Sequence, residues 1–240
     1  MDFYRALSTY YDEIFPLRAP QRTFIQNYLR QESLTSVLDI GCGTGTFALE
    51  TSQTGVRVLG VDLSEEMVEI SKKKAIEKGS HAAFSLADMR DLSGISEEFD
   101  GVFCLGNTLA HVSGDIELKE VLAQFEQKGP RLLLQTVNYD RILAKQVKEL
   151  PIIKTSHLTF YRHYTYRSDG LLEFTMDIEL ADTRQLVSGT NLLYPIKGAS
   201  LIEALLETGW EVSGQWGNFD KAAWTEESPA TVLEAKRMAK

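Results

Sequence analysis

Short apolar runs alternate with segments of helical spacing over residues 36–137. The apolar runs predict strands at 36–40, 56–61, 81–86, 99–105 and 131–137. The helical spacing between them predicts helices at 46–52, from an N-cap at Ser64 onward, and at 116–127. Strands that alternate with helices indicate a parallel sheet covered on both faces.

The pattern differs on both sides of this region. Residues 1–31 are predicted to be helical, with a break at Phe15-Pro16 and Ala19-Pro20. Runs at 157–168 and 171–182 alternate with period two around Asp169-Gly170, which is a strong hairpin signal, and 185–193 can add a third strand. These runs predict an antiparallel meander.

The last part of the chain returns to the first pattern. Residues 199–208 predict a helix closed by Gly209, and 210–216 and 231–236 predict strands that complete the main sheet. The expected fold class is α/β, a doubly wound and mostly parallel sheet with an inserted small antiparallel β flap. We expect an N-terminal helical cap at 1–34, a cofactor-binding domain formed by 35–150 with 195–240, and the β insertion at 151–194 over the active site.

Composition narrows the classes of partner. The 240 residues are 43% hydrophobic and carry a formal net charge of -9, which makes the chain a poor match for nucleic acid. The basic run Lys72-Lys73-Lys74 is expected on a solvated helix face. The two cysteines do not suggest a disulfide framework, and we find no secretion signal and no apolar stretch of membrane-spanning length. We therefore expect a cytoplasmic protein without a membrane partner, as a monomer or homodimer. No histidine grouping indicates a metal site.

A glycine-rich loop follows the first predicted strand. Positions 37–45 read VLDIGCGTG, so an apolar strand ending in Asp39 leads into Gly41, Gly43 and Gly45 and then a helix. Glycines there allow a sharp turn and let a ligand lie against the main chain, while the N–H groups that begin the helix face it. The loop therefore predicts a nucleotide-like cofactor at the carboxyl end of the first strand.

Two acidic residues end the next two strands. Asp62 lies 21 residues after Gly41, where a carboxylate can accept hydrogen bonds from both ribose hydroxyls. Asp88 ends the third strand, with Met89 after it, and is placed to meet an adenine edge. Each residue also has a simpler interpretation, as a helix cap for Asp62 and a turn residue for Asp88.

Four motifs taken together resemble those of a known family. VLDIGCGTG at 37–45, GVDLS at 60–64, LADM at 86–89 and FDGVF at 99–103 resemble the successive motifs of the class I S-adenosylmethionine-dependent methyltransferases. The resemblance covers 37–137, about two fifths of the chain. It implies a Rossmann-like methyltransferase fold and the cofactor S-adenosylmethionine, with S-adenosylhomocysteine as its product.

The resemblance also implies roles for individual residues. It places the glycine loop under the methionine part of the cofactor, Asp62 at the ribose, Asp88 and Met89 at the adenine, and Leu105 near the methionine amino group. Tyr11 resembles an N-terminal tyrosine that reaches the cofactor's carboxylate. The flanking motif residues expected in the same cofactor-binding site are Asp39, Cys42 and Leu63.

The segment LGNTLAHV at 105–112 follows the fourth strand, at the crevice end where the methyl group would react. It lacks the Asp/Asn-Pro-Pro-aromatic motif of base-modifying enzymes and more closely resembles small-molecule N-methyltransferases of the glycine and sarcosine type. Asn107 and His111 are the candidate catalytic residues, and His111 can equally be structural. Over them, the flap would bring aromatic side chains: Phe160, Tyr161, Tyr164, Tyr166 and Tyr194.

Three functions stay open from sequence. The leading prediction is methyl transfer to a nitrogen or oxygen of a small molecule by in-line displacement, which needs positioning and exclusion of water rather than a catalytic triad. A non-catalytic S-adenosylmethionine-binding protein is the first alternative. A nicotinamide-dependent dehydrogenase is the second, and the glycine spacing disfavours it.

Overall fold

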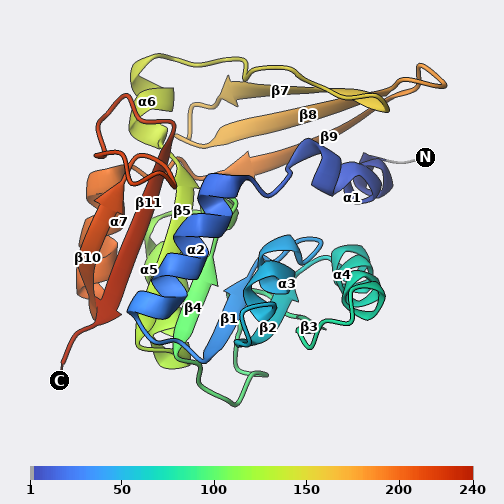
Figure 1. The fold of residues 1–240 in the computed structure, drawn as a ribbon. Helices are drawn as coiled ribbons and strands as arrows, with labels where there is room; N and C mark the ends of the chain where they lie inside the picture. Colours follow the sequence, from blue (N-terminus) through green and yellow to red (C-terminus); the bar gives the residue numbers. More distant parts are fainter. Residues whose placement is uncertain (1–2, 240) are drawn as a thin grey trace.

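A seven-stranded, mostly parallel sheet forms the centre of the protein in a computed structural model that describes residues 3–239 (Figure 1). Its strand order is β10-β11-β5-β4-β1-β2-β3, and β11 is antiparallel to both neighbours. The strands are β1 (Ser36–Ile40), β2 (Arg57–Asp62), β3 (Ala83–Leu86), β4 (Gly101–Cys104), β5 (Arg131–Val137), β10 (Trp210–Trp216) and β11 (Ala230–Arg237).

Helices cover both faces of this sheet, as the alternating pattern predicts. On one face of the sheet, one apolar cluster contains side chains of α2 and another contains side chains of α3 and α4. On the opposite face, the largest apolar cluster joins the sheet to α5 and α7. The helices are α1 (Phe3–Ile14), α2 (Ala19–Gln31), α3 (Thr46–Ser52), α4 (Glu65–Glu77), α5 (Asp115–Lys128), α6 (Tyr139–Ala144) and α7 (Gly198–Glu207), with a 3-10 turn η1 (Thr108–His111).

A separate antiparallel sheet forms the flap, which confirms the period-two prediction. It contains β6 (Ile153–Lys154), β7 (Leu158–Tyr166), β8 (Leu172–Leu180) and β9 (Leu186–Leu193). The inward face of this sheet carries Leu172, Met176 and Ile178. Helix α1 packs against this face, and its residue Phe3 lies in the same apolar cluster as Met176 and Ile178. Figure 1 shows α1 lying between this sheet and the α3–α4 side of the main sheet.

The chain reverses its direction of winding between β1 and β4. From β1 it moves outward through β2 and β3, then returns to β4 and β5 on the other side of β1. The carboxyl ends of β1 and β4 therefore border a crevice, which is the usual ligand position in such sheets.

Local signals account for most element boundaries. The Ser64 hydroxyl accepts from the Met67 amide at 3.3 Å and caps α4, and Gly209 (φ +90°) follows the end of α7. Sequence patterns did not indicate η1, the short α6 or the two-residue β6, because none is long enough to establish a period.

Candidate active site

The glycine loop turns immediately after β1 and is anchored to β2. The amides of Gly41 and Cys42 both donate to the Val61 carbonyl, at 2.8 and 3.0 Å. Gly41, Gly43 and Gly45 all have positive φ, at +69°, +55° and +77°. This left-handed conformation is the one that glycine adopts without strain, so the backbone itself explains the residue type.

Neighbouring side chains approach this loop too closely for a Cβ atom. A Cβ on Gly41 would lie 2.4 Å from Oγ1 of Thr108, which belongs to η1. A Cβ on Gly43 would lie 3.3 Å from the ring of Tyr11, which comes from α1. The loop is therefore a junction between the crevice segment after β4 and the N-terminal helix.

The Asp62 carboxylate is hydrogen-bonded to the glycine loop and lies at the crevice. One carboxylate oxygen accepts from the Gly43 amide at 2.8 Å, and the other accepts from the Ser64 amide at 2.9 Å. Each oxygen keeps a second lone pair, so Asp62 can still accept from a ligand's hydroxyl groups.

Asp39 presents an unpaired buried carboxylate at the same place. It is 2% exposed, and its Oδ2 has no hydrogen-bond partner in the described part of the chain. Burial, and then the charge of Asp62, raises the pKa of Asp39 to about 7. A cationic ligand group beside this carboxylate would remove the cost of its burial.

The N-terminal helix is fastened to the loop by Asp12. Its Oδ1 accepts from the hydroxyls of Thr44 and Thr46, both at 2.6 Å, and its Oδ2 accepts from Lys74 at 2.6 Å. Lys74 is only 15% exposed, so the expectation of a solvated Lys72-Lys73-Lys74 face is wrong for its third member. Successive helix positions point in different directions, and only Lys74 points toward α1.

The Tyr11 ring of α1 lies against the glycine loop at Gly43. Burial and the negative charge of Asp62 raise its pKa to about 12, so its hydroxyl stays protonated and can donate a hydrogen bond.

Asp88 is placed at the edge of the crevice, in an ion pair that sequence did not indicate. Its carboxylate contacts Arg90 at 3.0 Å, and Arg90 also pairs with Glu117 and donates to the carbonyl of His111. Arg90 therefore joins the loop after β3 to the loop after β4.

Four further predicted site residues differ in exposure. Cys42, Met89 and Leu105 are buried, at 7%, 7% and 3% exposed, whereas Leu63 is 64% exposed beside Asp62. Burial raises the pKa of the Cys42 thiol, which keeps it neutral and unreactive. Leu63 therefore leaves an apolar surface open next to Asp62.

The two candidate catalytic residues occupy different positions. The Asn107 side chain donates to the Tyr139 hydroxyl and accepts from the Val137 amide, both at 2.9 Å, so both of its polar atoms hold the crevice segment to β5 and α6. The ring of His111 has no hydrogen bond within residues 3–239, and only its backbone carbonyl is occupied.

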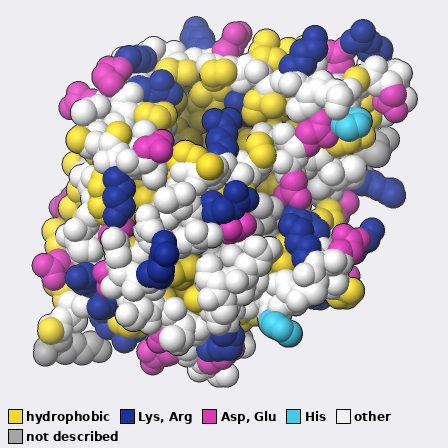
Figure 2. Space-filling view, in the orientation of Figure 1, with side chains coloured by type: hydrophobic (Ala, Val, Ile, Leu, Met, Phe, Trp, Pro, Cys, Tyr) yellow, Lys and Arg dark blue, Asp and Glu magenta, His cyan; other side chains and the backbone are white. Residues whose placement is uncertain are grey.

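Hydrophobic side chains line a hollow below the flap on the face shown in Figure 2, with a basic side chain beside it. Most predicted flap aromatics are structural. Phe160 packs on Phe15 of the α1–α2 connection, Tyr166 donates to two carbonyls at the end of α6, and Tyr194 donates to Asp115. Tyr164 is buried against the crevice segment without a hydrogen bond from its hydroxyl to any described residue.

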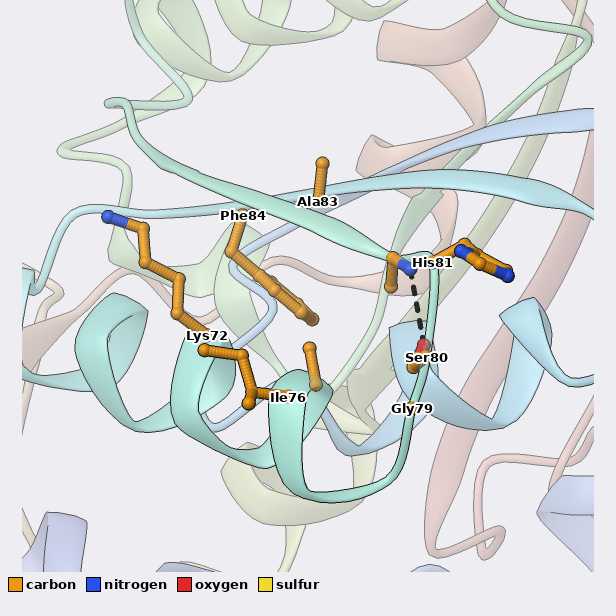
Figure 3. Close-up of a pocket in the computed structure, with 9 residues that line it drawn as sticks. Lys72, Ile76, Gly79, Ser80, His81, Ala83 and Phe84 are labelled. Atoms are coloured by element: carbon orange, nitrogen blue, oxygen red, sulfur yellow. Dashed lines mark hydrogen bonds between the residues drawn. The ribbon is translucent and has the colours of Figure 1, made fainter.

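A second hollow, of about 510 Å³, lies elsewhere, between α4 and the start of β3 (Figure 3). Its lining includes Lys72, Ile76, His81 and Phe84. The hydrogen bond drawn in Figure 3 is a local one, from the Ala82 amide to the Ser80 hydroxyl. Within residues 3–239, no group of three His, Cys, Asp or Glu side chains is arranged to hold a metal ion.

Comparison with known proteins points to methyltransferases. Residues 37–129 match a family model described as a methyltransferase domain, which spans β1 to the end of α5. The chain is 27% identical over 224 residues to a glycine/sarcosine N-methyltransferase of Aphanothece halophytica, covering 89% of this chain and 80% of that protein. It is 31% identical to the glycine N-methyltransferase of Mus musculus, but spans only 48% of that protein's length.

Solved structures show the same fold. An S-adenosylmethionine-dependent methyltransferase from Clostridium acetobutylicum superimposes with a TM-score of 0.85 over 98% of this chain and 99% of its own, at 15% identity. An amino pentose methyltransferase from Micromonospora echinaspora, solved with S-adenosylmethionine bound, gives a TM-score of 0.70 at 19% identity, covering 99% and 98% of the two chains.

The matched domain, the relatives and the fold together identify a methyltransferase that uses S-adenosylmethionine as its cofactor. They support the resemblance to the class I S-adenosylmethionine-dependent methyltransferases. The dehydrogenase and the non-catalytic alternatives are not favoured by these comparisons. No helix within the described residues is long and apolar enough to cross a membrane.

The residues present fit this cofactor. S-adenosylmethionine carries a sulfonium and an ammonium, and the crevice offers the unpaired Asp39 carboxylate and the partly free Asp62 carboxylate. We propose that Asp39 faces the cationic methionine end, that Asp62 accepts from the ribose, and that Tyr11 donates to the methionine carboxylate. The same proposal keeps Asp88 and Met89 at the adenine.

Cofactor affinity is expected to rise with pH around neutrality. Below a pKa of about 7, Asp39 is protonated and neutral, whereas a cationic ligand favours its ionised form, so binding must release a proton. Affinity should therefore increase by up to about tenfold per pH unit below that pKa and level off above it. Calorimetry in two buffers of different ionisation enthalpy would measure the proton released. Asp39→Asn should bind with no such pH dependence, and a proton release unchanged in that variant would contradict the assignment.

Proposed function

We propose that this methyltransferase transfers a methyl group to a nitrogen or oxygen of a small molecule, with His111 receiving the proton that the acceptor loses. The observation that carries the proposal is the free imidazole of His111 at the crevice end of β4. The relatives named above act as N-methyltransferases, which favours nitrogen.

His111 has the ionisation state that this role needs. Desolvation, followed by the charge of Arg90, lowers its pKa from the ordinary value of 6.5, and Asp62 opposes the shift. The ring is therefore neutral at pH 7 and can accept a proton from an acceptor nitrogen or oxygen that becomes more acidic as it is methylated.

The remaining residues position and enclose the acceptor. When bound, S-adenosylmethionine supplies a methyl group already activated by its sulfonium. Asn107 holds the crevice segment against β5, and the segment in turn contacts the glycine loop through Thr108. The flap covers this end of the crevice and limits access of water.

His111→Ala should lower kcat/KM by about 100-fold and change cofactor affinity by less than about twofold, because it removes a proton acceptor and no cofactor contact. In wild type, kcat/KM should fall with acid along a limb below pH 6.5, and the variant should lose that limb. His81→Ala, an exposed histidine beside the second hollow, is the matched control. Wild-type turnover in the His111→Ala variant would show that His111 is not the proton acceptor.

Asn107→Gly tests positioning without changing backbone strain, because Asn107 has φ +72° and glycine tolerates that value. It should lower turnover by about tenfold or more through loss of the two 2.9 Å bonds, with cofactor affinity kept. Released S-adenosylhomocysteine, measured with a panel of small amines and alcohols, provides the rate and identifies the acceptor. A chelator should leave this rate unchanged, and a chelator-sensitive rate would mean that a metal takes part.

A further inference from the structure

Two arginines near the crevice have no carboxylate partner. Arg141 lies on α6 and Arg162 on β7, and neither belongs to an ion pair within residues 3–239. The Nε of each guanidinium is buried and has no hydrogen-bond acceptor there. A guanidinium stays charged at every physiological pH, so an unsatisfied buried Nε is costly.

Several other arginines of this acidic chain are paired with carboxylates. Arg131 pairs with Glu32 at 2.5 Å, and Arg167 pairs with Asp169 at 2.9 Å. With a net charge of -9, carboxylates are in excess over the basic side chains. Arg237 also has a buried Nε without a hydrogen bond, but it pairs with Glu98 and Glu126, whereas Arg141 and Arg162 pair with no carboxylate within residues 3–239.

Both arginines border the acceptor side of the crevice. Arg162 lies on the same face of β7 as Phe160 and Tyr164, with its guanidinium carbon 5.6 Å from the centre of the Phe160 ring. Its one side-chain hydrogen bond within the described residues goes to the Pro151 carbonyl at 2.9 Å. Arg141 follows Tyr139, whose hydroxyl is bound by Asn107 of the crevice segment.

Tyr164 connects the two. Its ring packs in one apolar cluster with Ala110 of the crevice segment and Tyr139. Burial raises the pKa of Tyr164 to about 12, and the charges of Arg162 and Arg141 both act against that rise. Arg162 and Tyr164 share one face of β7, and Arg141 lies on α6 next to Ile142, which packs in the same apolar cluster as Tyr164.

We propose that Arg141 and Arg162, with the Tyr164 hydroxyl, form a subsite for an anionic group of the methyl acceptor. Planar guanidinium groups bind carboxylate and phosphate oxygens in pairs, and Tyr164 can donate one more bond. The acceptor class is then a small amine or alcohol with a carboxylate or phosphate attached. This inference rests on the proposed function, since it assumes that the acceptor enters below the flap.

The first experiment follows the anion itself, with no need to know the acceptor. Thermal unfolding of the full chain saturated with S-adenosylhomocysteine is measured in sodium acetate, sodium phosphate and sodium chloride at equal ionic strength. Acetate or phosphate should raise the midpoint above chloride in wild type. That rise should be lost in Arg162→Gln and in Arg141→Gln, and partly kept in Arg162→Lys, which retains the charge without the paired donors.

Arg167→Gln is the matched control, because Arg167 lies on the same flap with two carboxylate partners. It should respond to anions as wild type does. Equal midpoints in all three salts for wild type, or an unchanged rise in both the Arg141→Gln and Arg162→Gln variants, would overturn the proposal.

A second experiment distinguishes the source of the anion. Glycine, phosphoethanolamine and ethanolamine are compared by release of S-adenosylhomocysteine or, where none is methylated, by calorimetric binding to the complex. One of the two anionic amines should bind roughly 30-fold or more tightly than ethanolamine, and Arg162→Gln should remove the difference. Equal binding of all three contradicts the subsite. Cofactor affinity, measured on every variant, separates this outcome from failure of the proposed function, in which the cofactor or turnover itself would be lost.

Discussion

Gly41→Ala should reduce cofactor affinity on the order of 100-fold, about 2.7 kcal/mol. The new Cβ would lie 2.4 Å from Oγ1 and Cγ2 of Thr108 and 2.9 Å from its Cβ, in a backbone with φ +69°. Overpacking and strain of this kind each cost about 1–3 kcal/mol. The loop or η1 must shift, and that shift moves the amides that face the cofactor. Calorimetric titration with S-adenosylmethionine measures the loss.

A second glycine separates strain from the contact with Thr108. Gly79 has φ +60° with open space around it, so Gly79→Ala should cost about 1 kcal/mol of stability and leave cofactor affinity unchanged. Thr108→Gly, added to Gly41→Ala, removes all three close contacts and should restore part of the affinity. Equal cofactor affinity of the Gly41→Ala and Gly79→Ala variants would show that the close contact does not matter.

Asp62→Ala should weaken cofactor binding by roughly 3 kcal/mol, more than 100-fold. The carboxylate accepts from the amides of Gly43 and Ser64 and faces the crevice, so its removal unfastens the glycine loop and leaves the proposed ribose hydroxyls unpaired. Calorimetry gives the affinity, and circular dichroism should show an intact fold.

Two comparisons make the Asp62 result specific. Asp62→Asn keeps one acceptor oxygen and the shape of the side chain, so it should lose less affinity than the alanine variant. Asp182→Ala removes an exposed carboxylate that accepts from the neighbouring Thr183 amide in the flap, and it should leave cofactor affinity at the wild-type value. Unchanged cofactor affinity in the Asp62→Ala variant would show that Asp62 does not bind the cofactor.

Helix α1 connects the cofactor loop with the flap. Asp12 is bonded to Thr44, Thr46 and Lys74 on the loop side, while Glu13 pairs with His157 on the flap side at 2.9 Å. The apolar face of the same helix packs under the flap. A ligand that binds in the crevice beside Tyr11 would therefore contact α1, the helix that also packs against the flap.

The elements were largely predictable because their signals are local. The strand 36–40, the helix 46–52 and the hairpin at Asp169-Gly170 each show within about ten residues the period or turn chemistry that specifies them. The order of winding followed from the alternation of strands and helices. The short α6 carried no such period, although its position after β5 places Arg141 at the crevice.

The site was predictable only in part. The sequence by itself indicated the glycine loop and the position of Asp62 at the end of β2, because the turn and the strand end are specified locally. Its motifs also carried the resemblance to methyltransferases. Only the tertiary structure decided that Lys74 is withdrawn from solvent by Asp12, and that Asn107 holds the crevice segment while the His111 ring stays free. It alone also brought Arg141 and Arg162 to one tyrosine. These contacts join residues far apart in the chain, and pairing at such separations depends on how the helices and the flap pack, which no local pattern encodes.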